Sequence, residues 1–166
     1  MSYFMGLILP SKSSDMLDKV KSMFNNYTER EFTYSLERTL NKGEHFYYWG
    51  GTGPEEGFSS YELCKRIEET KEIIEEKDER FKEFFFRDLL PSIEISKKDA
   101  ARWRDIIHTF FDVCGIKRMG ILMYWVSNHI DECDFTAFPN DTTHLNDVTP
   151  DVIMKFKPEV IHYIIA

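Results

Sequence analysis

The apolar pattern at the start of the chain predicts a strand and then a helix. Residues 3–9 form an apolar stretch typical of a buried strand, and Pro10 follows it. Ser13 or Ser14 can then cap a helix whose apolar residues recur on one side. These residues are Met16, Leu17, Val20, Met23 and Phe24.

A β-hairpin is predicted next. Apolar and polar residues alternate over residues 32–40, and a turn at residues 41–43 separates this stretch from an aromatic run over residues 46–49. Three apolar residues of the first stretch are also spaced four apart, which fits one face of a helix. The helical alternative therefore remains open for residues 32–40.

A long helix is predicted in the middle of the chain. Ser59 and Glu62 form a capping box, and apolar residues recur at helical spacing until Pro91, which is expected to end the helix. At 1.5 Å per residue this helix would be about 46 Å long. Because that length is large for a chain of this size, a break is expected near residues 77–78.

A short strand and a second helix are expected after the proline. Ile93 and Ile95 suggest the strand, and Ser96 and Asp99 can cap the helix, which ends at Gly115. The inward-facing residues of this helix are Trp103, Ile106, Ile107, Phe110, Phe111 and Cys114.

The last third of the chain predicts two strands on either side of a long loop. Residues 119–126 are typical of a buried central strand, whereas the segment from Ser127 to Val148 has no helical period and little alternation. Thr149 and Pro150 then begin a short helix, and residues 160–165 make a terminal strand.

Together these elements predict a single α+β domain over residues 1–166. Its sheet is expected to be mostly antiparallel or mixed, with about five or six strands and two main helices packed on one face. The length of 166 residues fits one domain, and the 42% of hydrophobic residues supply its core.

The cysteines and the apolar runs predict a cytoplasmic protein without membrane contact. Three cysteines cannot all pair within one chain, and none forms a Cys-x-x-Cys motif, so free thiols in a reducing compartment are expected. The apolar stretch at the start has no basic leader. No apolar run approaches the roughly 20 residues that cross a bilayer.

The glycine-rich loop from Gly50 to Gly57 is placed where a phosphate-binding loop would lie. It lacks the Lys and Ser or Thr of a P-loop, and Glu55 and Glu56 would repel phosphate. A flexible turn is therefore the favoured interpretation.

A second candidate for chemistry is a group of metal-binding residue types near the long loop. The group contains His129, Asp131, Cys133, Asp134 and His144, but its spacing matches no common zinc site or EF-hand. Neither a metal nor a cofactor is expected. A small hydrolase or transferase that uses His129, Cys133 or His144, with the glycine-rich loop as a lid, remains an alternative function.

The negative charge is concentrated in one segment. The chain has a net charge of −8, which opposes direct binding of nucleic acid. Residues 119–154 contain no Lys or Arg and six acidic residues. Solubility alone is one explanation of such a charge.

The placement of this charge favours a binding protein over an enzyme. Acidic side chains beside aromatic residues suit an inhibitor of a basic protein, such as a bacterial immunity protein that neutralises a nuclease toxin. The candidate partner-binding residues are Asp131, Glu132, Asp134, Phe135, Phe138, Asp141 and Asp147. A non-catalytic subunit of a larger assembly is the third alternative, with an exposed aromatic hairpin as its contact. The hairpin candidates are Tyr47, Tyr48 and Trp49.

Overall fold

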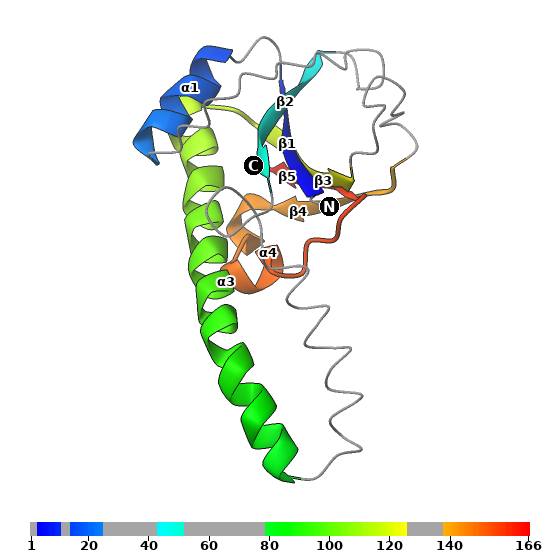
Figure 1. Cartoon of the computed structure of the whole chain (residues 1–166). Coiled ribbons are helices and arrows are strands. Elements are labelled where there is room, and N and C mark those ends of the chain that lie inside the picture. The colour runs from blue at the N-terminus through cyan, green and yellow to red at the C-terminus, as the bar shows by residue number, and fades with distance from the viewer. Residues whose placement is uncertain (1–2, 11–13, 25–42, 52–78, 126–137) are drawn as a thin grey trace.

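The computed structural model describes residues 3–10, 14–24, 43–51, 79–125 and 138–166. Figure 1 shows the described elements in chain order. They are β1 (Tyr3–Pro10), α1 (Ser14–Met23), β2 (Glu44–Gly51), α3 (Glu79–Cys114), β3 (Arg118–Trp125), β4 (Asn140–His144), the 3-10 turn η3 (Leu145–Asp147), α4 (Pro150–Ile153) and β5 (Ile161–Ile165).

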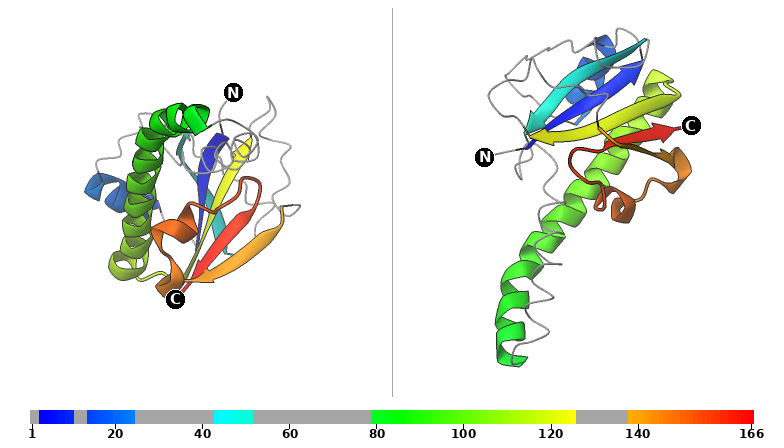
Figure 2. Two further views of the ribbon diagram at one scale, coloured as in Figure 1. Left: turned by 90° about the horizontal axis from the view of Figure 1, so that it is seen from below. Right: turned by 90° about the vertical axis from the view of Figure 1, so that its right-hand side faces the viewer.

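The described strands form one mixed sheet of five strands in the order β2-β1-β3-β5-β4. β1 pairs antiparallel with β2 and β3, and β3 pairs antiparallel with β5. β4 instead runs parallel to β5. Figure 2 shows helix α3 lying across one face of the sheet. This architecture confirms the predicted α+β class, and residues 118–125 form the central strand, as expected.

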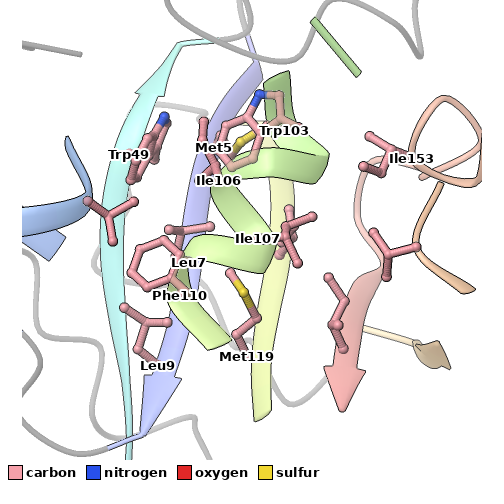
Figure 3. Packing of buried hydrophobic residues seen from close by; sticks show 14 of the residues in the cluster. Met5, Leu7, Leu9, Trp49, Trp103, Ile106, Ile107, Phe110, Met119 and Ile153 are labelled. Carbon is pink, nitrogen blue, oxygen red and sulfur yellow. The ribbon is translucent and has the colours of Figure 1, made fainter. Parts of the chain in front are cut away.

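An aromatic cluster joins the sheet to α3. Trp49 of β2 packs against Trp103, with ring centroids 5.3 Å apart, and edge-on against Phe110, with centroids 6.3 Å apart. Figure 3 shows these side chains between the helix and the strands. Other buried members of the cluster include Met5, Leu7, Leu9, Leu17, Val20, Ile106, Ile107, Met119, Ile121, Ile153 and Ile164. Trp and Phe bury large areas, so this contact supplies much of the hydrophobic stabilisation.

The opposite face of the sheet is buried as well. Its buried side chains are Ile8, Phe46, Leu122, Ile161 and Tyr163. Two glycines make room for them, because a Cβ at Gly6 would overlap the ring of Phe46, and one at Gly120 would lie 3.1 Å from Cβ of Ile8. Burial on both faces explains why residues 5–9 and 119–123 read as nearly continuous apolar runs.

Helix α3 does not end at Pro91 as the sequence predicted. The helix of 36 residues runs without interruption through Pro91 and includes Ile93 and Ile95, so the predicted end and the predicted short strand are wrong. A proline removes one helical hydrogen bond at a local cost of about 3 kcal/mol, which a long helix can absorb by bending. Figure 2 shows that α3 is curved and that its first half extends beyond the sheet. The predicted break near residues 77–78 lies outside the described residues.

The long predicted loop also needs correction. Asn140–His144 form a strand within the segment predicted as loop, and Leu145–Asp147 form a 3-10 turn. An edge strand is paired on one side only and can remain polar and exposed, so β4 has no apolar alternation that sequence reasoning could detect. The short helix after it begins as predicted, because the Thr149 hydroxyl accepts a hydrogen bond from the Val152 N–H.

The predicted hairpin is only partly described. Its second strand exists as β2, which pairs with β1 in the register Leu7 to Tyr47. Residues 32–40, the expected first strand, lie outside the described residues. In the part of the chain that the structure describes, no helix is both long enough and apolar enough to cross a membrane.

Substitution of Gly6 tests the packing on the second face of the sheet. We expect Gly6→Ala to displace the buried Phe46 ring and to lower the free energy of unfolding by about 1–3 kcal/mol. Gly120→Ala should cost less, because its Cβ would meet its neighbours at 3.1 to 3.3 Å. Urea denaturation measures both losses. Adding Phe46→Leu to Gly6→Ala should restore part of the stability, and no rescue would contradict this packing.

Candidate functional site

The candidate site lies at the edge of the sheet where β4 and β5 run side by side. The parallel register places Asp141 of β4 directly beside His162 of β5. His162 is buried, with 3% of its surface exposed, whereas 55% of the Asp141 side chain is exposed. A buried titratable side chain therefore meets an exposed carboxylate at this edge.

Hydrogen bonds occupy both ring nitrogens of His162. Its Nδ1 lies 2.8 Å from Oδ1 of Asp141. Its Nε2 lies 2.9 Å from the Lys157 backbone N and 3.0 Å from the Lys157 backbone O. Nδ1–H can donate to Asp141, and Nε2 can accept from the Lys157 N–H or, when it carries a hydrogen, donate to the Lys157 carbonyl.

The turn before β5 is fixed by the same histidine. The Phe156 ring stacks on the His162 ring, with centroids 4.2 Å apart and planes 4° from parallel. The Glu159 N–H donates to the Met123 carbonyl at 2.7 Å, and Glu159 adopts a positive φ of 58°. These contacts join the turn, β3 and β4 to one another.

Burial and hydrogen bonds at both ring nitrogens give His162 a structural role. A catalytic base needs a free lone pair that can take a proton from a substrate. Both ring nitrogens of His162 already have hydrogen-bond partners within the protein. The Asp141–His162 pair therefore holds the edge strand against β5.

A second polar cluster crosses the opposite face of the sheet. The Tyr163 hydroxyl donates to Oε2 of Glu44 at 3.2 Å, and the Arg118 guanidinium lies 3.9 Å from the centre of the Tyr163 ring. Arg118 also pairs with Glu44, with 3.5 Å between Nε and Oε1. Burial, followed by the negative charge of Glu44, raises the pKa of Tyr163, and Arg118 opposes this shift.

The structure describes three of the seven predicted partner-binding residues. Asp131, Glu132, Asp134 and Phe135 lie outside the described residues. Phe138 is half-buried, and Asp141 and Asp147 are exposed.

The structure does not bring Asp141 and Asp147 together. Asp141 lies near the start of β4, and Asp147 lies beyond the end of that strand in η3. β4 alone spans roughly 13 Å at about 3.3 Å per residue. The two acids therefore occupy opposite ends of the edge strand.

The aromatic hairpin is not the exposed surface that the sequence suggested. Tyr47 and Trp49 are 7% and 1% exposed and belong to the core beneath α3. Tyr48, the remaining candidate, belongs to β2. The expectation is wrong for Tyr47 and Trp49 because alternate residues of a strand face the same side, which in β2 is the side that α3 covers.

Most of the residues considered for catalysis and metal binding lie outside the described residues. His144 is exposed on β4, whereas His129, Cys133 and residues 52–57 lie outside the described residues. Among the described residues, no three His, Cys, Asp or Glu side chains are placed to hold a metal ion. Burial raises the pKa of the Cys114 thiol, with a smaller opposing effect of Lys19, which disfavours a reactive thiolate there.

His162 was missed by sequence reasoning, although a signal was present. It is the polar residue in the otherwise apolar strand Ile161–Ile165. A polar residue at a buried strand position needs a hydrogen-bond partner, which points to a polar neighbour on an adjacent strand. The sequence could not identify Asp141 as that neighbour, because β4 was itself not predicted.

Comparisons with known protein families, with curated proteins and with solved structures found no match. The interpretation of the site therefore rests on its geometry and charge.

Removal of the Asp141 carboxylate tests the structural role of the pair. Asp141→Ala leaves the buried Nδ1–H of His162 without its acceptor, and we expect it to lower the free energy of unfolding by about 1–2 kcal/mol. Asp141→Asn should cost less, because its amide oxygen can still accept the hydrogen bond. Asp147→Ala, a matched exposed acid, should change stability by less than about 0.5 kcal/mol. Equal losses for Asp141→Ala and Asp147→Ala in urea denaturation would contradict this role.

The raised pKa of Tyr163 predicts a loss of stability at alkaline pH. The pKa of Tyr163 is higher in the folded protein than its ordinary value of 10.0. The neutral side chain therefore stabilises the fold fully at pH values below 10.0, and this contribution is lost as the pH rises through the higher, folded-state pKa. Tyr163→Phe should therefore show a smaller alkaline loss of stability than the wild-type protein. Ultraviolet titration of the tyrosines should show one late-ionising group that disappears in this variant, and Glu44→Gln should make that group ionise earlier. An unchanged titration in Tyr163→Phe would refute the assignment.

Proposed function

We propose that this protein binds a basic protein in the cytoplasm and inhibits it, for example as a bacterial immunity protein that neutralises a nuclease toxin. The supporting observation is the segment over residues 119–154, which has six acidic residues and no Lys or Arg. A segment with one sign of charge produces a directed electrostatic field even on a protein of modest net charge.

Three acids of this segment are among the described residues. Asp141, Asp147 and Asp151 are exposed on β4, η3 and α4. β4 lies beside β5, whereas α4 lies against α3 (Figure 1). Of the three acids, Asp141 lies on the edge strand itself, and the exposed Lys155 and Lys157 follow α4.

Exposed carboxylates suit the inhibition of a nucleic-acid-binding protein. Such a partner carries Lys and Arg where it binds phosphate groups, and carboxylates can occupy the same positions. Complementary charge also accelerates association, so that the inhibitor quickly reaches the nucleic-acid-binding cleft of its partner. Inhibition then results from occupation of the cleft and requires no chemistry by this protein.

Neutralising the acids tests this proposal. The partner is first identified by affinity capture and mass spectrometry, and then purified for stopped-flow kinetics. Asp131→Asn, Glu132→Gln and Asp134→Asn combined should lower the association rate by about tenfold or more. The wild-type rate should fall steeply with added salt.

A matched triple variant separates local charge from total charge. Asp18→Asn, Glu83→Gln and Asp112→Asn remove the same number of charges from exposed positions on α1 and α3. We expect this variant to associate at nearly the wild-type rate. Equal effects of the two triple variants, or a captured partner that is not basic, would overturn the proposal.

A further inference from the structure

The outer side of β4 is an open strand edge within the described sheet. β4 is the last strand in the order β2-β1-β3-β5-β4, and its inner side pairs with β5. The Ile161 N–H donates to the Pro139 carbonyl at 2.9 Å. In a parallel ladder the hydrogen-bonding residues alternate, so Asp141 and Thr143 direct their backbone groups toward β5.

The other residues of β4 direct their backbone groups outward. By the same alternation, these are Asn140, Thr142 and His144, and all three are exposed. Within the described residues, no strand pairs with this side of β4. A row of outward N–H and C=O groups is a template for one further strand.

β4 is also held in position before any partner arrives. The Asp141 carboxylate is bound to the buried His162, which is fixed in turn by Lys157 and by the stacked Phe156. An edge that is already ordered loses little conformational entropy on binding. It contains neither a proline nor a lysine, the residues that commonly block an edge.

The charge along this edge selects the kind of strand that can be added. Asp141 lies near one end of β4, and Asp147 follows the other end. A second copy of this chain would bring the same acids to the interface, and like charges opposite one another are destabilising. A segment with Lys or Arg would instead meet a carboxylate near each end of the strand.

We propose that the outer edge of β4 receives an extended, basic segment of the partner as an additional strand. This inference rests on the proposed function and specifies the surface and the binding mode. Backbone hydrogen bonds from Asn140 and Thr142 supply affinity, and the acids at the two ends of the strand select the charge of the segment.

Synthetic peptides test the edge without knowledge of the partner. The probe is a fluorescent peptide of about eight alternating lysine and valine residues, a usual strand length. It is compared with a glutamate counterpart and with a form that is N-methylated at every residue. We expect the basic peptide to bind and the glutamate peptide not to bind. N-methylation should weaken binding about tenfold, because it removes backbone donors.

A pair of protein variants gives an independent measurement. Thr142→Pro removes one outward N–H, so it should also weaken peptide binding about tenfold. Because proline is tolerated in an edge strand, the melting temperature should stay near that of the wild-type protein. Thr142→Val changes the side chain alone and should bind nearly as well as the wild type.

Each contrary result has its own meaning. Equal binding of the methylated and unmethylated peptides would overturn strand addition but would leave the acidic surface intact. Absence of binding by the basic peptide would also overturn strand addition, while the test with the captured partner still decides the proposed function. Equal binding of the glutamate peptide would contradict both proposals. A dimer that Thr142→Pro dissociates would show that a second copy occupies this edge.

Discussion

The contact between the second half of α3 and the sheet is the constraint on which the described structure depends. Trp103 and Phe110 of the helix meet Trp49 of β2, and the aliphatic residues of β1 and β3 surround them. Burial of these rings fixes the face that each strand turns toward the helix, because a shift of one residue would exchange the two faces of a strand. The same orientation places His162 of β5 on the side of Ile164, where Phe156 can stack on it.

Sequence reasoning recovered the elements whose patterns are strong and local. Residues 3–9, 119–126 and 160–165 were predicted as strands, and these predictions agree with β1, β3 and β5. The helix end predicted at Pro91 was wrong because a proline removes only one hydrogen bond, and the hydrogen bonds of the neighbouring turns continue the helix. β4 was missed because a polar, half-paired edge strand carries no apolar signal. Its parallel pairing with β5, a contact across 21 residues between Asp141 and His162, is a tertiary property.

The sequence shows where the acidic residues of the candidate site lie along the chain, but it does not show which side chains they contact. The absence of Lys and Arg from residues 119–154 can be read directly from the sequence. Whether a given acid is available to a partner depends on its neighbours, and the carboxylate of Asp141 is already bound to His162. Likewise, Tyr47 and Trp49 resemble interface residues in composition, yet the register of β2 against β1 turns them toward the core.

The fold places the described acids of this segment outside the central strands of the sheet. The segment begins in the central strand β3, whose residues are buried and uncharged between Met119 and Met123, so its acids can appear only after the chain leaves the centre of the sheet. The chain then forms the outermost strand before it returns through α4 to β5, which separates β4 from β3. Asp141 is thereby placed on the outermost strand, beside backbone groups that no described strand uses. Charge and an open strand edge coincide there because both follow from the order in which the chain builds this sheet.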